Sequence, residues 1–369
     1  MTTEQFIKQK LQERQQGGSY RQLQANTNLI DFCSNDYLGF ARSAELSALV
    51  SEELQKNTPT LNGSTGSRLL AGNTLYAEEL EKSIAHSHYE EAGLLFNSGY
   101  DANLGLLSSL PQRGDTVIHD ELAHASIIDG IRLSHAKRYS FTHNNLESLE
   151  QKLKTAQGNC YVVVESVYSM DGDLAPLEAL IELTEQYHAA LIVDEAHALG
   201  VFDKGLVNML NLHDRVFARI ITFGKALGCH GAIVLGSQIL RSYLINFARS
   251  FIYTTAAPMH QLATIRMGYE LLSNAQPAID QLQSNIKLYN SLTASSSSLS
   301  AIKTVVIGGN QQTKDMAATI QQAGLDVRAI LSPTVPEGTE RLRICLHAHN
   351  SAEEIKQLTD IIKFNLHGA

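Results

Sequence analysis

Short apolar runs alternate with longer polar, helix-forming stretches through the middle of the chain. The runs are rich in Val, Ile and Leu and are too short for helices, which is typical of strands buried on both faces of a sheet. They occupy residues 93–96, 117–118, 161–165, 191–194, 219–222 and 231–236. This alternation predicts an α/β fold whose large domain has a mostly parallel sheet sandwiched by helices.

The flanking segments carry weaker signals. Residues 3–16 are polar and helix-forming and end at a Gly pair, which predicts an N-terminal helix. Further helices are expected to begin near residues 74, 146 and 260. Residues 339–346 alternate in polarity, which predicts a strand with Arg341 and Arg343 on one face. The serine run at residues 295–298 predicts a surface loop.

A chain of 369 residues is long enough for more than one domain. We expect an N-terminal segment at residues 1–40, a large cofactor-binding domain at residues 41–265 and a C-terminal domain at residues 266–369. The net charge of -9 and the lack of a long basic run argue against nucleic acid or an anionic membrane as the main partner.

The N-terminal residues contain no apolar run of signal-peptide length, and no later window reaches the length of a membrane span, so a cytoplasmic protein is expected. The four cysteines are scattered without close pairs, which favours reduced thiols over a disulfide framework or a zinc site. Cys229 lies beside a lysine, and we interpret it as a buried bystander.

A single lysine, Lys225, lies in the turn between two of the predicted buried strands. On this stretch alone, a surface lysine in a hairpin is an equally good interpretation. Asp194, however, ends another buried strand, as a catalytic acid at the carboxyl end of a strand should. A lysine that forms a Schiff base and an aspartate that keeps a pyridine nitrogen protonated are what pyridoxal phosphate requires.

Three motifs carry a family resemblance: Thr-Phe-Gly-Lys at residues 222–225, Asp-Glu-Ala-His at 194–197 and Ser-Met-Asp-Gly-Asp at 169–173. With them the chain resembles the α-oxoamine synthases, from near residue 21 to its last helix. The resemblance implies a fold-type I aminotransferase-like large domain and a smaller α+β C-terminal domain. It also implies pyridoxal 5'-phosphate as cofactor, and a homodimer with shared active sites.

The strand-to-helix turn at residues 97–100 would direct backbone N–H groups at an anion, and the resemblance places the cofactor phosphate there. It implies Lys225, His124 and Asp194 as catalytic residues, with His124 stacked on the ring. Taken alone, a histidine or serine after a strand would more often be structural. The implied cofactor-binding residues are Ser98, Gly99, Tyr100, His124, Ser169, Asp194, His197, Thr222, Lys225, Thr254 and Thr255.

For the substrates, an arginine is the natural clamp of a carboxylate, and the resemblance selects Arg343 over Arg341. It also implies that Asn35 helps to hold the amino acid and that Arg21 and Thr334 contact the acyl substrate. The implied reaction condenses L-alanine with a pimeloyl thioester, on CoA or a carrier protein, and releases carbon dioxide in biotin synthesis. Glycine or serine with another acyl-CoA is the alternative.

Three positions that border the acyl pocket in the family depart from its pattern, namely Leu206, Val207 and Leu331. Another function class is suggested by residues 194–197, which also spell the DEAH box of helicase ATPases. The Walker A loop that this box requires is absent from the sequence. The alternating pairs His86/His88 and His347/His349 lack accompanying Cys or carboxylate ligands in a recognisable pattern, so no metal is expected.

Overall fold

The computed structural model describes residues 1–23, 28–57, 62–293 and 298–367. The chain forms two compact units. The larger contains residues 35–169 and 173–282, and the smaller contains residues 1–34, 170–172 and 283–369. The predicted domain limits at residues 40 and 265 stay a prediction, and residues 295–297 of the predicted serine loop lie outside the described residues.

A seven-stranded sheet in the order β2-β8-β7-β6-β5-β3-β4 forms the centre of the larger unit. All neighbouring strands are parallel except at β8, which runs antiparallel to both β2 and β7. The sheet confirms the predicted fold class. The strands are β2 (Ala92–Phe96), β3 (Thr116–Asp120), β4 (Lys137–Phe141), β5 (Cys160–Glu165), β6 (Ala190–Asp194), β7 (Ala218–Thr222) and β8 (Ala232–Gly236).

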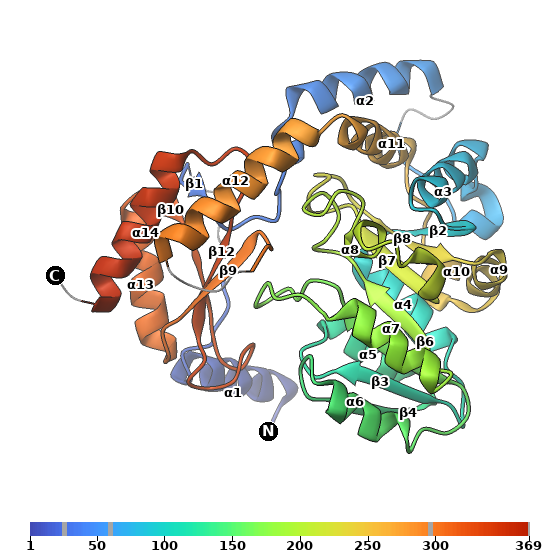
Figure 1. Ribbon diagram of the computed structural model, residues 1–369, viewed down its shortest axis with the longest axis horizontal. Coiled ribbons are helices and arrows are strands. Elements are labelled where there is room, and N and C mark those ends of the chain that lie inside the picture. The colour runs from blue at the N-terminus through green and yellow to red at the C-terminus, as the bar shows by residue number, and fades with distance from the viewer. Residues whose placement is uncertain (24–27, 58–61, 294–297, 368–369) are drawn as a thin grey trace. The chain divides into compact units, whose positions relative to one another are not determined.

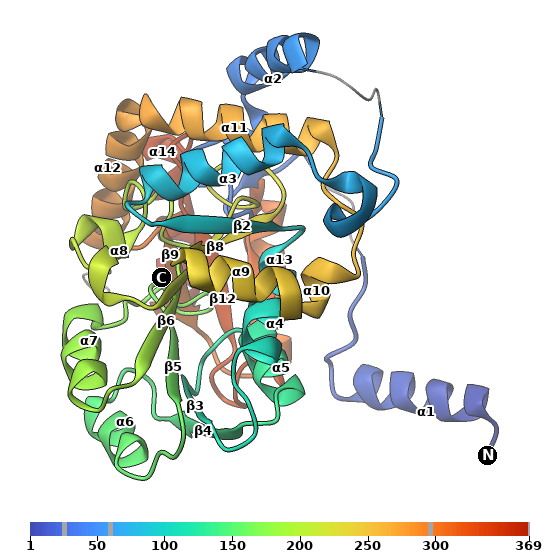
Figure 2. The ribbon, with the colours of Figure 1, turned by 90° about the vertical axis from the view of Figure 1, so that its right-hand side faces the viewer.

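Helices cover both faces of this sheet, and Figure 2 shows α6 and α7 on one side of β3 and β5 and α4 and α5 on the other. The core between them is apolar, with Leu106, Val163 and Ile192 fully buried. The helices of this unit are α2 (Ala44–Asn57), α3 (Leu75–Ser87), α4 (Gly99–Ser109), α5 (Ala125–Leu133), α6 (Leu146–Leu153), α7 (Leu177–Gln186), α8 (Leu206–Met209), α9 (Gln238–Phe247), α10 (Arg249–Ile252) and α11 (Met259–Ser273). Shorter helical turns lie at η1 (Phe40–Arg42), η2 (Arg68–Gly72) and η3 (His213–Arg215).

The smaller unit contains an antiparallel sheet in the order β11-β12-β9 and a parallel pair, β1 with β10. Figure 1 shows α13 and α14 beside this sheet, and α12 begins in the larger unit and continues into the smaller one. The predicted arginine-bearing strand is β12. The elements are α1 (Thr3–Gln16), β1 (Ile30–Asp31), α12 (Gln276–Thr293), β9 (Ile302–Val306), α13 (Asn310–Gln322), β10 (Leu325–Asp326), β11 (Arg328–Ile330), β12 (Arg341–Cys345) and α14 (Ala352–His367).

Within the described residues, none of the helices combines the length and the apolar character that crossing a bilayer requires.

Candidate active site

A pocket of about 230 Å³ lies in the larger unit where β5, β6 and β7 end. Open α/β sheets bind their ligands at this carboxyl edge. The structure thus brings together side chains that are up to 195 positions apart in sequence, as the span from residue 35 to residue 230 shows. Among the predicted site residues, the wall contains Asn35, Ser98, Gly99, Tyr100, His124, Asp194, His197, Thr222 and Lys225.

Lys225 lies in the tight turn between β7 and β8. Gly228 closes this turn by donating its N–H to the Lys225 carbonyl at 2.8 Å. Its φ of 59° favours glycine, and a Cβ there would overlap the backbone of Ala41. The Lys225 amine lies 3.5 Å from the Thr222 hydroxyl, so the turn holds the amine at the pocket wall.

Asp194 ends β6 and is only 4% exposed. One carboxylate oxygen accepts the Ala196 N–H at 2.9 Å, and the other accepts the Asn103 side-chain N–H at 2.7 Å. These donors stabilise a buried negative charge, because a carboxylate out of water needs hydrogen bonds. Asp194 can therefore hold a proton on a ligand nitrogen without leaving its place.

A hydrogen-bonded chain links Asp194 to His124. The Asn103 amide that contacts Asp194 also donates to the Ser126 hydroxyl at 3.1 Å. That hydroxyl lies 2.8 Å from Nδ1 of His124, and the Ser126 N–H donates to the same nitrogen at 3.2 Å. Nδ1 is thus an acceptor and the proton of the neutral ring lies on Nε2. Burial lowers the pKa of His124, aided by the charge of Lys225 and opposed by Asp194.

The start of α4 offers an anion site. Ser98 caps this helix by accepting the Asp101 N–H at 3.0 Å, which leaves the first N–H groups of the helix without intrahelical partners. A Cβ on Gly99 would lie 2.5 Å from the Thr222 methyl group, so glycine is required for this helix to meet the end of β7. The Tyr100 hydroxyl is held by Asp129.

The turn before η1 supplies a further partner to the pocket. The hydroxyl of Tyr37, which is fully buried, lies 2.7 Å from Nδ1 of His197 and 3.2 Å from the Asn35 side-chain oxygen. Asn35 and His197 both line the pocket, so Tyr37 orients two predicted site residues from behind. Sequence reasoning identified the turn but missed Tyr37.

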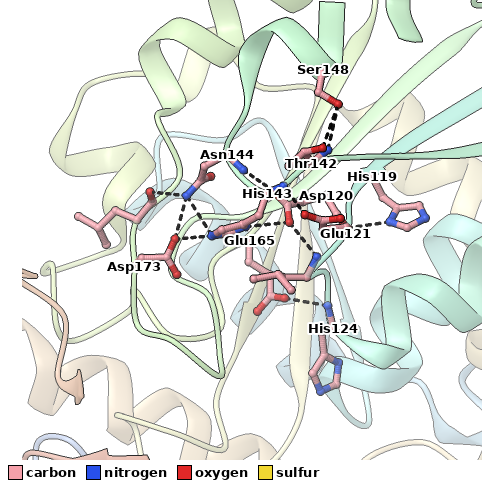
Figure 3. A network of polar contacts seen from close by, with 12 residues as sticks. His119, Asp120, Glu121, His124, Thr142, His143, Asn144, Ser148, Glu165 and Asp173 are labelled. Atoms are coloured by element: carbon pink, nitrogen blue, oxygen red, sulfur yellow. Dashed lines mark hydrogen bonds and ion pairs between the residues drawn. The ribbon is translucent and has the colours of Figure 1, made fainter. Parts of the chain in front are cut away.

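Glu165 ends β5 beside Asp194 in the register of β5 and β6. It is 3% exposed, and its carboxyl group accepts the His124 N–H at 2.7 Å (Figure 3). Burial and then the charge of Asp194 raise the pKa of Glu165 to about 8, against the His124 N–H, Lys225 and the Ser169 N–H, which lower it. The carboxyl group is therefore mainly neutral at pH 7. Sequence reasoning placed Glu165 in a strand and gave it no role.

The comparisons with known proteins agree with this geometry. The chain matches the family model of class I and II aminotransferases over residues 27–362. An 8-amino-7-oxononanoate synthase of Emericella nidulans is 43% identical to it over 363 residues, which cover 90% of this chain and 88% of the relative. The chain belongs to the 8-amino-7-oxononanoate synthase family.

Two solved structures are also similar to this chain. An 8-amino-7-oxononanoate synthase from Francisella tularensis has a TM-score of 0.80 and 28% identity, and the match covers 92% of this chain and 98% of that one. A serine palmitoyltransferase from S. paucimobilis with bound pyridoxal phosphate and myriocin has a TM-score of 0.87 and 26% identity, covering 97% and 96%. The chain is a pyridoxal-phosphate enzyme and an acyltransferase.

The pocket of this family member fits pyridoxal phosphate. The start of α4 offers N–H groups for the phosphate, and the absent Cβ of Gly99 keeps that helix close to β7. The buried carboxylate of Asp194 suits a protonated pyridine nitrogen, and the amine of Lys225 lies on the same wall.

The helicase-like sequence at residues 194–197 has a structural explanation. Glu195 is fully buried and forms an ion pair with Arg219, which is also fully buried, at 2.5 Å. The same carboxylate accepts the Val207 N–H at 2.9 Å. Glu195 therefore joins β7 to the start of α8, where the departing residues Leu206 and Val207 are buried.

Three predicted cofactor residues are not on the pocket wall. Ser169 is 7% exposed and lies just beyond Glu165, to which its backbone N–H bonds. Thr254 and Thr255 line another hollow of about 420 Å³ in the larger unit. The side chain of Asn97, next to the start of α4, donates to the Thr254 hydroxyl at 3.0 Å.

The remaining predicted substrate residues lie in the smaller unit. Arg21 donates to the Thr334 hydroxyl at 3.1 Å, and both line a pocket of about 280 Å³ together with Leu331. Arg343 on β12 donates to the Cys345 sulfur at 3.0 Å. The structure thus brings Arg21 and Thr334 together, and their contact with an acyl substrate stays a prediction.

The histidine pair of the smaller unit has a carboxylate nearby, contrary to the expectation from spacing. His347 and His349 stack at 4.7 Å, and potential ligand atoms of both lie within 4.8 Å of Asp31. However, the two ring nitrogens of His347 already contact the Asn350 side-chain oxygen and the Ser34 carbonyl, at 3.1 and 2.9 Å. These contacts give His347 a structural role.

Proposed function

We propose that the chain condenses L-alanine with a pimeloyl thioester and produces 8-amino-7-oxononanoate, carbon dioxide and a free thiol. The observation that carries this proposal is the 43% identity to an 8-amino-7-oxononanoate synthase over 90% of the chain. The likeness to serine palmitoyltransferase is lower in sequence, at 26%. The α-carbon of alanine would attack the thioester carbonyl, the thiolate would leave, and the β-keto acid would lose carbon dioxide.

Bound pyridoxal phosphate supplies an electron sink for the bonding electrons at the amino-acid α-carbon. In our proposal, Lys225 anchors the cofactor and then moves the α-proton on its amine. Asp194 keeps the proton on the pyridine nitrogen, and neutral His124 orients the ring. His197 and Ser169 would hydrogen-bond the ring oxygen of the cofactor, and the Tyr37 hydroxyl, 2.7 Å from Nδ1 of His197, orients His197 for this.

Arg343 is our candidate for binding the amino-acid carboxylate, together with Asn35. The neighbouring Arg341 is 9% exposed and is already engaged by Asp171 in an ion pair. This ion pair counts against Arg341 as the clamp, because a guanidinium already neutralised inside the protein binds a substrate carboxylate poorly.

Arg21 and Thr334 are proposed to contact the acyl substrate, with Leu331 beside them. A guanidinium suits the terminal carboxylate of a pimeloyl chain and offers nothing to a plain fatty acyl chain. We also propose a homodimer in which Thr254 and Thr255 reach the phosphate of the partner's cofactor.

A substrate panel tests the proposal. Alanine, glycine and serine would each be mixed with acetyl, succinyl, pimeloyl and palmitoyl thioesters, on CoA and on a carrier protein, while thiol and carbon dioxide release are followed. We expect alanine with pimeloyl to be fastest. One methyl group in a pocket is worth only about 1–3 kcal/mol of discrimination, so residual glycine turnover is compatible with the proposal. A faster reaction of glycine or serine with another acyl group would replace the substrate assignment.

A further inference from the structure

A histidine outside the pocket bridges two carboxylates in the larger unit. His143 lies in the loop between β4 and α6, with Nδ1 2.9 Å from Asp120 and Nε2 2.5 Å from Asp173 (Figure 3). Both ring nitrogens face carboxylate oxygens, which only accept when ionised, so both nitrogens donate and the ring is an imidazolium. The two hydrogen bonds raise the pKa of His143 to about 10, against burial, which alone would lower it.

One of these carboxylates is a fixed anchor. Asp120 ends β3, is fully buried, and accepts the N–H groups of Leu122 and Asn144 at 2.8 and 3.0 Å. Burial would raise the pKa of Asp120, but the hydrogen bonds from His143 and these two N–H groups lower it overall. Asp120 is therefore a charged group held by the sheet.

The other carboxylate belongs to the hairpin that follows β5. Val167 and Leu174 pair across this hairpin, and the Tyr168 N–H donates to the Asp173 carbonyl at 3.0 Å. The Asn144 side chain, next to His143, donates to the Asp173 carboxylate at 2.8 Å and to the Leu174 carbonyl at 3.2 Å. The β4–α6 loop is thus hydrogen-bonded to the arm of the hairpin that contains Asp173 and Leu174.

The opposite arm leads to Ser169. The His143 ring packs edge-on against Tyr168, with ring centroids 4.4 Å apart and an interplanar angle of 88°. Ser169 follows directly, and its N–H bonds to Glu165, which also binds the His124 N–H. The imidazolium therefore contacts both arms of the hairpin, one step from a predicted cofactor residue.

We propose that His143 is a positioning residue, a charged clamp that holds the hairpin at residues 167–174 to the end of β3 and so places the Ser169 hydroxyl for the cofactor. The inference rests on the proposed role of Ser169. Without the imidazolium, the buried carboxylate of Asp120 and the partly exposed carboxylate of Asp173 would lie near each other without a cation between them, and the hairpin would be held less firmly to the sheet.

The test uses His143→Gln, which keeps polarity without charge, and His119→Gln as the matched control. His119 lies in the same network, where Nδ1 contacts the Asp120 carbonyl at 2.8 Å, but it is not bonded to Asp173 (Figure 3). In His143→Gln we expect faster amide exchange at residues 167–174 of the cofactor-free protein. The dissociation constant of pyridoxal phosphate should rise about tenfold, the scale of one charge-assisted hydrogen bond. Both quantities should stay within about twofold in the control.

A double variant, His143→Gln with Asp173→Asn, removes the uncompensated carboxylate as well and should recover most of the cofactor affinity. Ser169→Ala should weaken cofactor binding in the parent protein and in His143→Gln. The factor should be smaller in His143→Gln, because the Ser169 hydroxyl is already displaced there. The inference would be overturned if amide exchange at residues 167–174 were the same in His143→Gln as in the parent protein. It would also be overturned if the effects of His143→Gln and Ser169→Ala on the free energy of cofactor binding were fully additive. These readouts involve no substrate, so they are independent of the alanine and pimeloyl assignment.

Discussion

At the scale of single residues, Lys225 and Asp194 are both held in place before any ligand binds, by a tight turn and by two N–H donors respectively. Lys225→Ala should therefore fold normally and lose only the covalent attachment of the cofactor. The purified protein should be yellow and the variant should lose that absorbance band, whereas Lys154→Ala at an exposed ion pair should keep it. A colourless parent protein that takes up no pyridoxal phosphate would contradict the cofactor roles.

Asp194→Asn separates binding from catalysis. The amide fits the same space and keeps an oxygen for the Asn103 donor, so the variant should bind the cofactor. It cannot hold a proton on the pyridine nitrogen, and a charge-assisted hydrogen bond contributes roughly 1.5–3 kcal/mol. We expect turnover to fall by more than about tenfold on that basis alone. Near-normal turnover, measured by thiol release, would show that Asp194 is structural.

Glu165 gives the site a pH dependence of known sign. Its pKa is raised from 4.5 to about 8, so the folded protein retains a proton that the unfolded chain releases between these values. The associated stability is fully present below pH 4.5 and is lost as pH rises through about 8. Glu165→Gln cannot titrate, so its melting temperature should rise relative to the parent protein as pH increases from 5 to 8. A difference in melting temperature between Glu165→Gln and the parent protein that stays constant over this pH range would contradict the raised pKa.

The sequence predicted Lys225 and Asp194 because each ends or follows an apolar run, a local signal. Tyr37 and Asn103 carry no such signal, and Glu165 ends an apolar run as Asp194 does but was interpreted only as part of a strand. Each of the three contacts a residue more than 40 positions away in the sequence. Tyr37, for example, contacts His197, which is 160 positions away. Only tertiary structure could assign them.

At the scale of elements, every apolar run in the centre of the chain became a strand, and the helix expected at residues 3–16 has those limits. The strand of the central sheet that sequence reasoning missed, β4, has exposed side chains at its first four residues and is the edge of the sheet. An edge strand of this kind lacks the apolar pattern because only one of its residues is buried. Its loop to α6 nevertheless carries His143.

The clamp formed by His143 should appear in alkaline stability. Its pKa is raised from 6.5 to about 10, so the folded state binds a proton that the unfolded state loses across that window. The stability from the clamp is complete below pH 6.5, declines above it and is gone once pH passes about 10. Urea midpoints should therefore fall more steeply between pH 7 and 10 in the parent protein than in His143→Gln. The variant His119→Gln is the reference. If the urea midpoints of the parent protein and His143→Gln fell equally steeply with pH, the folded protein would not bind this proton.

At the scale of the whole molecule, the proposed dimer has a visible candidate surface. Leu70 is 86% exposed and Tyr253 is 72% exposed, and both line the hollow that contains Thr254 and Thr255. Exposed apolar side chains grouped in this way mark interaction sites. The larger unit therefore offers an exposed apolar patch next to residues that the proposal assigns to the partner's cofactor.

Leu70→Asp should convert the dimer to a monomer in sedimentation experiments at micromolar concentration, because it places a charge in an apolar contact. Cofactor affinity should fall with it, since the partner's threonines would be lost. Ile239→Asp introduces the same charge at a position that is 82% exposed and outside the hollow, and should leave the dimer intact. A parent protein that sediments as a monomer would remove the shared-site proposal and leave the cofactor chemistry in place.

The contact between Gly99 and the methyl group of Thr222 has a consequence for ligand design. The start of α4 cannot approach β7 more closely, and the Ser98 cap prevents it from unwinding outward. The conformational entropy of this loop is therefore lost during folding and not on binding. An incoming phosphate meets a site whose size is already fixed. Inhibitors that retain a tetrahedral dianion in place of the phosphate should bind this site with full affinity. Bulkier or planar groups in its place should bind more weakly, because the start of α4 does not rearrange to accommodate them.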